Sequence, residues 1–156
     1  HKLDGGFFIA AENDGYARFS NPVRHKRTLL MLDPQHFLVR DTFRGKGSHA
    51  FQLNFHLHPD VIADRTEHGW RLEHGGAVVY LSLLMGSDDF DVVRGQKGPL
   101  MGWYSPAYGV RQETSVLSLT RKGKPGDVVF LTGISVNAPL SKKQFTEKAQ
   151  CILNTA

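Results

Sequence analysis

Two histidines two residues apart are the first side chains whose spacing could do chemistry. Apolar and polar residues alternate through residues 51–58, and a period of two predicts one strand with an apolar face and a polar face. His56 and His58 would then share a face, as paired metal ligands often do. A metal ion would need a third and a fourth ligand, and the nearby candidates do not have a diagnostic spacing: Asp60, His68 and His74. We therefore favour a solvated polar face and predict no metal site, with His56 and His58 kept as weak candidates.

A run of four potentially cationic residues, 24–27, stands just before a predicted strand at residues 28–32. Guanidinium groups match planar carboxylates and sulfates, so Arg24, His25 and Arg27 are candidate ligands for an acidic substrate. The alternative, which we favour from the residues alone, is a solvated strand edge where charges oppose aggregation.

Three aromatic residues, Trp103, Tyr104 and Tyr108, lie in a turn-rich stretch at residues 102–109. Aromatic rings in loops stack on the apolar face of sugar rings, which makes these residues candidates for carbohydrate binding. The alternative is that they pack against the end of a β-sandwich, and composition alone favours packing.

Other chemistries find no support in the sequence. There is no nucleophile motif, P-loop or dinucleotide-binding fingerprint. A single cysteine, Cys151, excludes an internal disulfide and a multi-cysteine metal site. The net charge of +4 is modest and favours anionic partners only weakly. The longest apolar runs are strand-length, so we predict no membrane segment.

The elements that must position these residues are predicted to be strands. Hydrophobic residues make up 40% and charged residues 22% of 156 residues, the composition of one globular domain. Short β-rich runs alternate with turn signals, among them a turn at residues 13–15 and a hairpin turn at residues 33–35. These links are too short for parallel crossovers. We predict an all-β, antiparallel β-sandwich of about eight to ten strands over residues 1–140.

The last residues differ in pattern. Ser141 and Gln144 have the spacing of a capping box, and Phe145, Ala149 and Ile152 follow at helical intervals. Residues 141–156 are therefore predicted to form a short helix or tail. The first residues, 1–6, lack an initiator methionine and an apolar signal core, which suggests a cut inside a longer protein.

A series of segments resembles the C-terminal part of bacterial heparinase II/III-like proteins. In order, the segments are Asp14-Gly15-Tyr16, Val23-Arg24-His25-Lys26-Arg27, Phe37-Leu38-Val39-Arg40-Asp41, Phe55-His56-Leu57-His58-Pro59 and Gly102-Trp103-Tyr104-Ser105-Pro106. The match covers about residues 7–136. The resemblance implies a β-sandwich joined in the full-length protein to an α/α-toroid domain, and β-elimination at uronic acids.

In that family the catalytic Tyr and His residues come largely from the toroid, and a His-x-His strand that sometimes holds zinc opens the sheet module. We expect the present chain to begin after that strand, so no catalytic or zinc residue is carried over. His56 and His58 belong to a later strand. No cofactor is expected in this chain, although zinc is possible in the full-length protein.

The resemblance thus predicts the sheet module of a lyase acting on acidic polysaccharide, itself inactive, which packs against the toroid or borders the substrate cleft. A stand-alone carbohydrate-binding module and a purely structural or interaction domain are the alternatives. We expect acidic polysaccharide and the toroid as partners, and neither nucleic acid nor membrane. A bacterial, periplasmic location is favoured over a cytoplasmic one.

Overall fold

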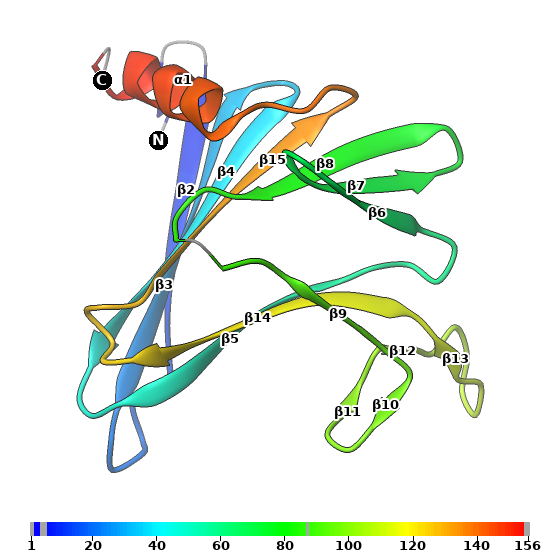
Figure 1. Cartoon of the computed structure of the whole chain (residues 1–156). Coiled ribbons are helices and arrows are strands. Elements are labelled where there is room, and N and C mark those ends of the chain that lie inside the picture. Colours follow the sequence, from blue (N-terminus) through cyan, green and yellow to red (C-terminus); the bar gives the residue numbers. More distant parts are fainter. Residues whose placement is uncertain (1, 4–5, 87, 155–156) are drawn as a thin grey trace.

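A computed structural model describes residues 2–3, 6–86 and 88–154, and most of them lie in β-strands (Figure 1). The elements in chain order are β1 (Lys2–Leu3), β2 (Gly6–Tyr16), β3 (Val23–Asp33), β4 (His36–Gly45), β5 (His49–His56), β6 (Ile62–Thr66), β7 (Gly69–His74), β8 (Ala77–Leu83), β9 (Asp91–Arg94), β10 (Gln96–Lys97), β11 (Leu100–Met101), β12 (Trp103–Tyr104), β13 (Gln112–Glu113), β14 (Ser115–Gly123), β15 (Val129–Val136) and α1 (Lys142–Asn154).

The strands form a large sheet and a small one. The large sheet has the order β1-β2-β3-β4-β15-β8-β7-β6, and the small sheet has the order β5-β14-β9. Two short ribbons, β10–β11 and β12–β13, complete the described strands, and every pairing is antiparallel. This confirms the predicted antiparallel sandwich with a short terminal helix. A simple meander is excluded, because β15 inserts between β4 and β8.

The main hydrophobic core lies between the two sheets. Strand β5 contributes its apolar face through Phe51 and Leu53, while Gln52 and His56 are exposed, so the predicted alternation is confirmed. The strand nevertheless ends at His56, two residues before the predicted end. The other buried members of this core are Val23, Trp70, Leu81, Leu83, Phe90, Leu117, Leu119, Val128 and Phe130.

A second, smaller core lies on the opposite face of the large sheet, beneath α1. Phe145 of the helix is fully buried against Leu32 of β3 and Leu38 of β4. The predicted capping box is confirmed, because the Ser141 N–H donates to Gln144 Oε1 at 2.8 Å and the Gln144 N–H donates to Ser141 Oγ at 3.3 Å.

Two predictions about the helical end remain open. The side chains of Cys151 and Ile152 lie outside the described part of the molecule, as do the side chains of residues 1–6. The division of the chain at residue 140 also stays a prediction. Within the described residues, α1 does not have the length and hydrophobicity that a membrane-crossing helix needs.

The first predicted turn, at residues 13–15, is wrong. Strand β2 continues to Tyr16 and its register with β3 shifts between Asn13 and Tyr16. The Gly15 N–H donates to the Asn13 side chain at 2.7 Å, so the turn-forming residues make an irregularity within the ladder. By contrast, the predicted hairpin turn at residues 33–35 is confirmed, since β3 and β4 pair on either side of it.

Asp33 ties that hairpin turn to the helix. Lys148 Nζ donates to Asp33 Oδ2 at 2.7 Å, the Gln35 N–H donates to Oδ1 at 3.0 Å, and His36 Nδ1 lies 2.6 Å from Oδ1. Burial opposes ionisation of the carboxyl group, but these three contacts outweigh it and lower the pKa of Asp33 to about 2.

We expect Asp33→Asn to lower the free energy of unfolding by about 1 kcal/mol at pH 6, because the carboxylate is partly exposed. Because folding lowers the pKa of Asp33, its carboxylate stabilises the folded protein fully at pH values above the unfolded-state pKa of about 3.9. This stabilisation is lost as the pH falls through about 2. Urea denaturation of the wild type and Asp33→Asn between pH 6 and pH 2 should show that the difference in their free energies of unfolding shrinks as the pH falls.

The control for this prediction is Glu147→Gln. Glu147 makes an exposed ion pair with Lys143 at 3.8 Å, so we expect a change below about 0.5 kcal/mol. If the difference in free energy of unfolding between the wild type and Asp33→Asn stayed constant down to pH 2, the lowered pKa of Asp33 would be contradicted.

Candidate functional site

The basic run at residues 24–27 lies inside β3, and the prediction that it precedes a strand is wrong. Strand β3 begins at Val23 and is paired on both sides, with β2 and with β4, so the run is not at an edge. Because successive side chains of a strand point to opposite faces, the run is divided between the two faces of the large sheet. His25 and Arg27 point to the inner face, toward the small sheet, and Arg24 and Lys26 point to the outer face.

On the inner face, His25 and Arg27 bind a buried carboxylate. Asp41 of β4 has only 2% of its surface exposed, and it stands opposite Arg27 in the ladder. Arg27 donates to both carboxylate oxygens, from Nε at 2.7 Å and from Nη2 at 3.0 Å, while His25 Nε2 lies 2.6 Å from Oδ1. The hydrogen bond to Asp41 raises the pKa of Arg27, although burial acts in the opposite direction. Arg27 neutralises the buried acid, and the contacts of both side chains with Asp41 limit their availability to a ligand.

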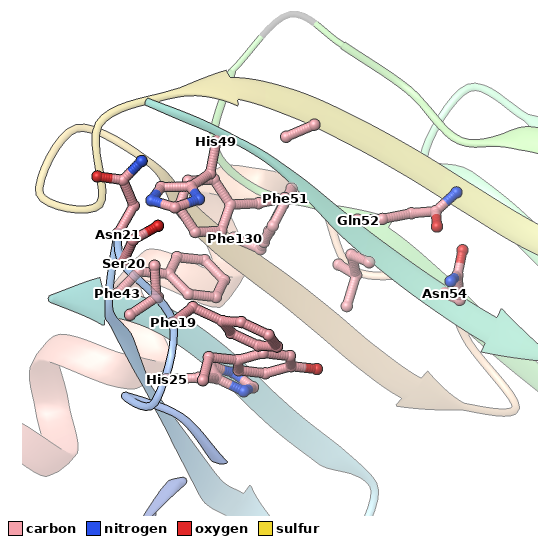
Figure 2. A pocket seen from close by; sticks show the side chains of 14 residues that line it. Phe19, Ser20, Asn21, His25, Phe43, His49, Phe51, Gln52, Asn54 and Phe130 are labelled. Carbon is pink, nitrogen blue, oxygen red and sulfur yellow. The ribbon is translucent and has the colours of Figure 1, made fainter. Parts of the chain in front are cut away.

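A pocket of about 600 Å³ opens beside His25, between the β2–β3 connection and β5 (Figure 2). His25 stacks on Phe43, with the ring centroids 5.0 Å apart. The rim of the pocket includes Tyr16 and Phe19, both of which are more than half exposed. The polar lining residues are Ser20, Asn21, His49, Gln52 and Asn54. Aromatic walls with a few amide groups are features of sugar-binding pockets.

The outer face carries four exposed cations on two adjacent strands. We call these residues, Arg24, Lys26, Arg40 and Arg44, the outer basic patch. Arg24 stands directly opposite Arg44 in the β3–β4 ladder, and alternate residues of each strand share a face. All four residues are exposed.

Only one carboxylate accompanies the outer basic patch among the described residues. Glu12 of β2 lies 3.1 Å from Arg24, and both side chains are exposed. Lys26, Arg40 and Arg44 have no carboxylate of the described chain within ion-pair distance. A flat surface with unneutralised, closely spaced cations attracts an extended polyanion.

Sequence reasoning missed Arg40 and Arg44, although the signal was present. The hairpin turn at residues 33–35 was predicted, and its register together with the strand alternation would have placed both arginines beside Arg24 and Lys26. Reading the basic run by itself concealed the two-strand arrangement.

The three aromatic candidates lie elsewhere, on the β12–β13 ribbon and its loop, and none lines the pocket. Trp103 is held in place, since its Nε1–H donates to the Gln96 carbonyl at 2.8 Å and Arg111 covers the ring at 4.0 Å. Tyr104 contacts the ring of His58. Tyr108, in contrast, is fully exposed. A role of these residues in binding stays a prediction.

The two weak metal candidates are not on one strand. Strand β5 ends at His56, and His58 lies in the connection that follows. The structure instead brings His58 together with Asp60 and His74, whose potential ligand atoms all lie within 4.8 Å of one another. Sequence spacing could not indicate this group, because His74 lies at the end of β7 while His58 and Asp60 lie in the connection before β6.

The chain is similar to known proteins both in sequence and in structure. The family model described as "Heparinase II/III-like, C-terminal" matches residues 2–149. None of the curated proteins compared with the chain matches it. Among solved structures, heparan sulfate lyase HepC from Pedobacter heparinus has a TM-score of 0.66 and 16% identity over 87% of this chain and 20% of that one.

A heparinase III structure has a TM-score of 0.60 and 18% identity, covering 90% of this chain and 20% of its own. A further heparinase III structure has a TM-score of 0.56 and 14% identity over 90% of this chain and 21% of that one. The chain therefore spans about a fifth of the length of these solved structures. At these identities, the similarity to the structures establishes a shared fold.

Proposed function

Because the chain belongs to the heparinase II/III-like C-terminal family, we propose that it is the β-sheet module of a lyase that cleaves uronic-acid-containing polysaccharide by β-elimination. The observation that carries the substrate class is the outer basic patch. Acidic polysaccharides present carboxylates, often with sulfates, at regular intervals along an extended chain. Arg24, Lys26, Arg40 and Arg44 present exposed cations on two adjacent strands, a spacing suited to such a chain.

The module itself is proposed to bind and not to cut. β-Elimination requires a group that removes the proton beside the carboxylate and a group that protonates the leaving oxygen. The outer basic patch contains only guanidinium and ammonium groups, which donate hydrogen bonds to carboxylates and sulfates and so suit binding. The catalytic groups are proposed to come from an α/α-toroid domain of the full-length protein, against which the sheet packs.

An assay of the 156-residue chain with heparan sulfate tests this division of labour. The unsaturated uronate product absorbs ultraviolet light, so cleavage is followed directly. We expect no product above a buffer control, with an active heparan sulfate lyase as the positive control. Product formation that is lost in Tyr16→Phe or His25→Ala would contradict the proposal and would place the chemistry in the pocket, which both residues line.

A second candidate function, that of a carbohydrate-binding module, is favoured by the pocket. Its volume of about 600 Å³ is within the usual range for small-ligand sites, and its rim carries exposed aromatic rings. Such a site would bind a neutral glycan with little dependence on salt and would quench aromatic fluorescence. Binding of acidic chains that weakens with salt favours the outer basic patch.

A further inference from the structure

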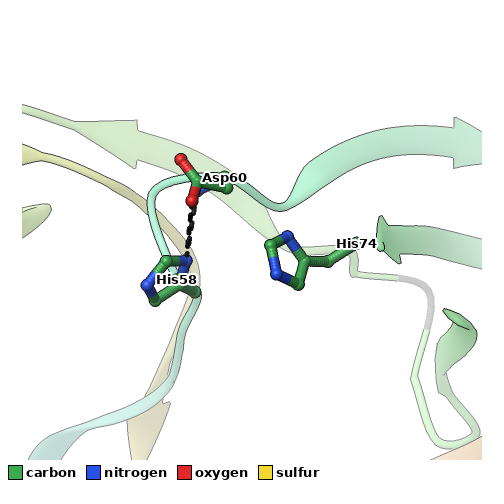
Figure 3. A group of neighbouring side chains, drawn as sticks. All are labelled: His58, Asp60 and His74. Carbon is green, nitrogen blue, oxygen red and sulfur yellow. Dashed lines mark hydrogen bonds and ion pairs between the residues drawn. The ribbon is translucent and has the colours of Figure 1, made fainter. Parts of the chain in front are cut away.

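We infer that His58, Asp60 and His74 form a binding site for a divalent transition metal ion, with Zn²⁺ as the best match. The three side chains meet where the connection after β5 passes the tip of the β7–β8 hairpin (Figure 3). This inference goes beyond the proposed polysaccharide function. It also concerns residues other than the family's His-x-His strand.

A tight turn sets two of the ligands side by side. The Val61 N–H donates to the His58 carbonyl at 3.0 Å, and Pro59 occupies the second position of this turn, where its fixed φ is favourable. The Asp60 N–H donates to His58 Nδ1 at 3.4 Å, and Asp60 Oδ2 lies 3.6 Å from the same nitrogen. The turn therefore presents an imidazole and a carboxylate to one point.

The turn is anchored on the side of the small sheet. The Leu57 N–H donates to the Ser115 carbonyl at 3.0 Å, and Thr114 Oγ1 donates to the Leu57 carbonyl at 2.6 Å. The ring of Tyr104 meets the His58 ring edge-on, with centroids 5.2 Å apart. His58 is thus positioned by β14 and by the β12–β13 ribbon, which reduces the entropy that metal binding would otherwise cost.

The third ligand comes from the large sheet. Ile62 pairs with Glu73 in the β6–β7 ladder, so the residues just before β6 lie beside the residues just after Glu73. His74 is the last residue of β7, and its ring centroid lies 5.5 Å from that of His58. The turn that follows is formed by two glycines with positive φ, Gly75 and Gly76. Because glycine has no side chain, neither residue blocks the site.

The ligand set matches Zn²⁺ chemistry. Two imidazoles and a carboxylate with a free fourth position are a known tetrahedral arrangement, with metal–ligand distances of about 2.0 to 2.2 Å. Those distances place neighbouring ligand atoms roughly 3.3 Å apart. His58 Nδ1 and Asp60 Oδ2 are close to that separation. All three residues are exposed, so rotation of the side chains can close the remaining gap and release Nδ1 from the long hydrogen bond with the Asp60 N–H.

Bound metal would join the two sheets at this end of the molecule, because His58 and Asp60 precede β6 while His74 ends β7 and the turn is anchored to β14. Adding Zn²⁺ to the metal-free chain should give one bound ion per chain. At a Zn²⁺ concentration about a hundredfold above Kd, the Tm should rise by roughly 8 °C. In NMR spectra, the imidazole resonances of His58 and His74 should shift while those of His68 should not.

Single substitutions provide the decisive comparison. We expect His58→Gln and His74→Gln each to weaken Zn²⁺ binding by about a hundredfold or more, since loss of an outer-shell partner alone costs roughly 10- to 100-fold. The matched control is His68→Gln, in the turn at the opposite end of the β6–β7 hairpin from His74, which is outside the group and should retain wild-type affinity. Because His58 and His74 are exposed and His68 is only partly buried, circular dichroism should show all three variants folded.

Two outcomes would overturn the inference. One is wild-type Zn²⁺ affinity in both His58→Gln and His74→Gln. The other is Zn²⁺ binding that affects His68 and the remaining histidines as strongly as His58 and His74, which would indicate non-specific association. Asp60→Asn provides a second check, because an amide replaces the carboxylate and should weaken binding without altering the turn.

Discussion

Replacing Phe145 by alanine is expected to lower the free energy of unfolding by about 3 to 5 kcal/mol, the usual cost of removing a fully buried phenylalanine. The ring has no exposed surface and fills the core beneath α1. Leu32 and Leu38 of the sheet would lose their main helical neighbour. Chemical denaturation at neutral pH measures this loss, and Thr146→Ala, at an exposed neighbouring position, should change stability by less than about 0.5 kcal/mol.

Gly133 gives a sharper version of the same test. A methyl group added at Gly133 of β15 would lie 2.6 Å from atoms of the Phe145 ring, far inside normal contact distance. Gly133→Ala should therefore cost about 1 to 3 kcal/mol by overpacking. In the double variant Gly133→Ala/Phe145→Ala the ring is absent and the added methyl group meets no clash. The double variant should therefore lose less stability than the sum of the losses in the two single variants. Simple additivity would contradict the proposed contact between helix and sheet.

The sheet framework could be predicted because its signals are local. In β5, apolar residues recur at every second position, and Phe51 and Leu53 are buried as that pattern requires. The capping box before Phe145 likewise uses residues three apart. Each of these features depends on neighbours in the chain, so the sequence is sufficient to indicate them.

The basic run was placed wrongly because its strand has no apolar alternation. Every residue from 24 to 27 is polar, and strand formation there depends on pairing with β2 and β4. The buried partner of Arg27, Asp41, lies on the next strand. A propensity argument on one segment cannot include such a partner, which explains why the run was assigned to a solvated edge.

The candidate sites depend on register between distant segments. Arg44 reaches Arg24 through the β3–β4 ladder, and His74 reaches Asp60 through the β6–β7 ladder. Strand β6 was not predicted, since its burial is irregular and it lacks a clear apolar face. Without that strand, the position of His74 relative to His58 could not be inferred.

Loss of two cations from the outer basic patch is expected to have the largest effect on polysaccharide binding. The variant Arg40→Gln/Arg44→Gln removes two exposed charges that have no acidic partner among the described residues, so the fold should be preserved. Each basic residue near an anionic surface contributes about 1 kcal/mol, so affinity for heparan sulfate should fall by a factor of roughly 30. The dependence of affinity on salt should also weaken, since fewer counterions are released.

A charge-matched control separates this local effect from net charge. The variant Lys97→Gln/Lys143→Gln removes two exposed cations from the β10–β11 ribbon and from α1, outside the outer basic patch. Its affinity for heparan sulfate should stay within about twofold of the wild type, allowing for weak long-range screening.

Titration of the wild-type chain and these two variants with heparan sulfate, at low and at physiological salt, is therefore the most direct test of the proposed role in binding acidic polysaccharide. The account predicts salt-sensitive binding by the wild type and the control, and a loss of roughly 30-fold confined to Arg40→Gln/Arg44→Gln. Equal affinities in both variants, or wild-type binding that does not depend on salt, would contradict it.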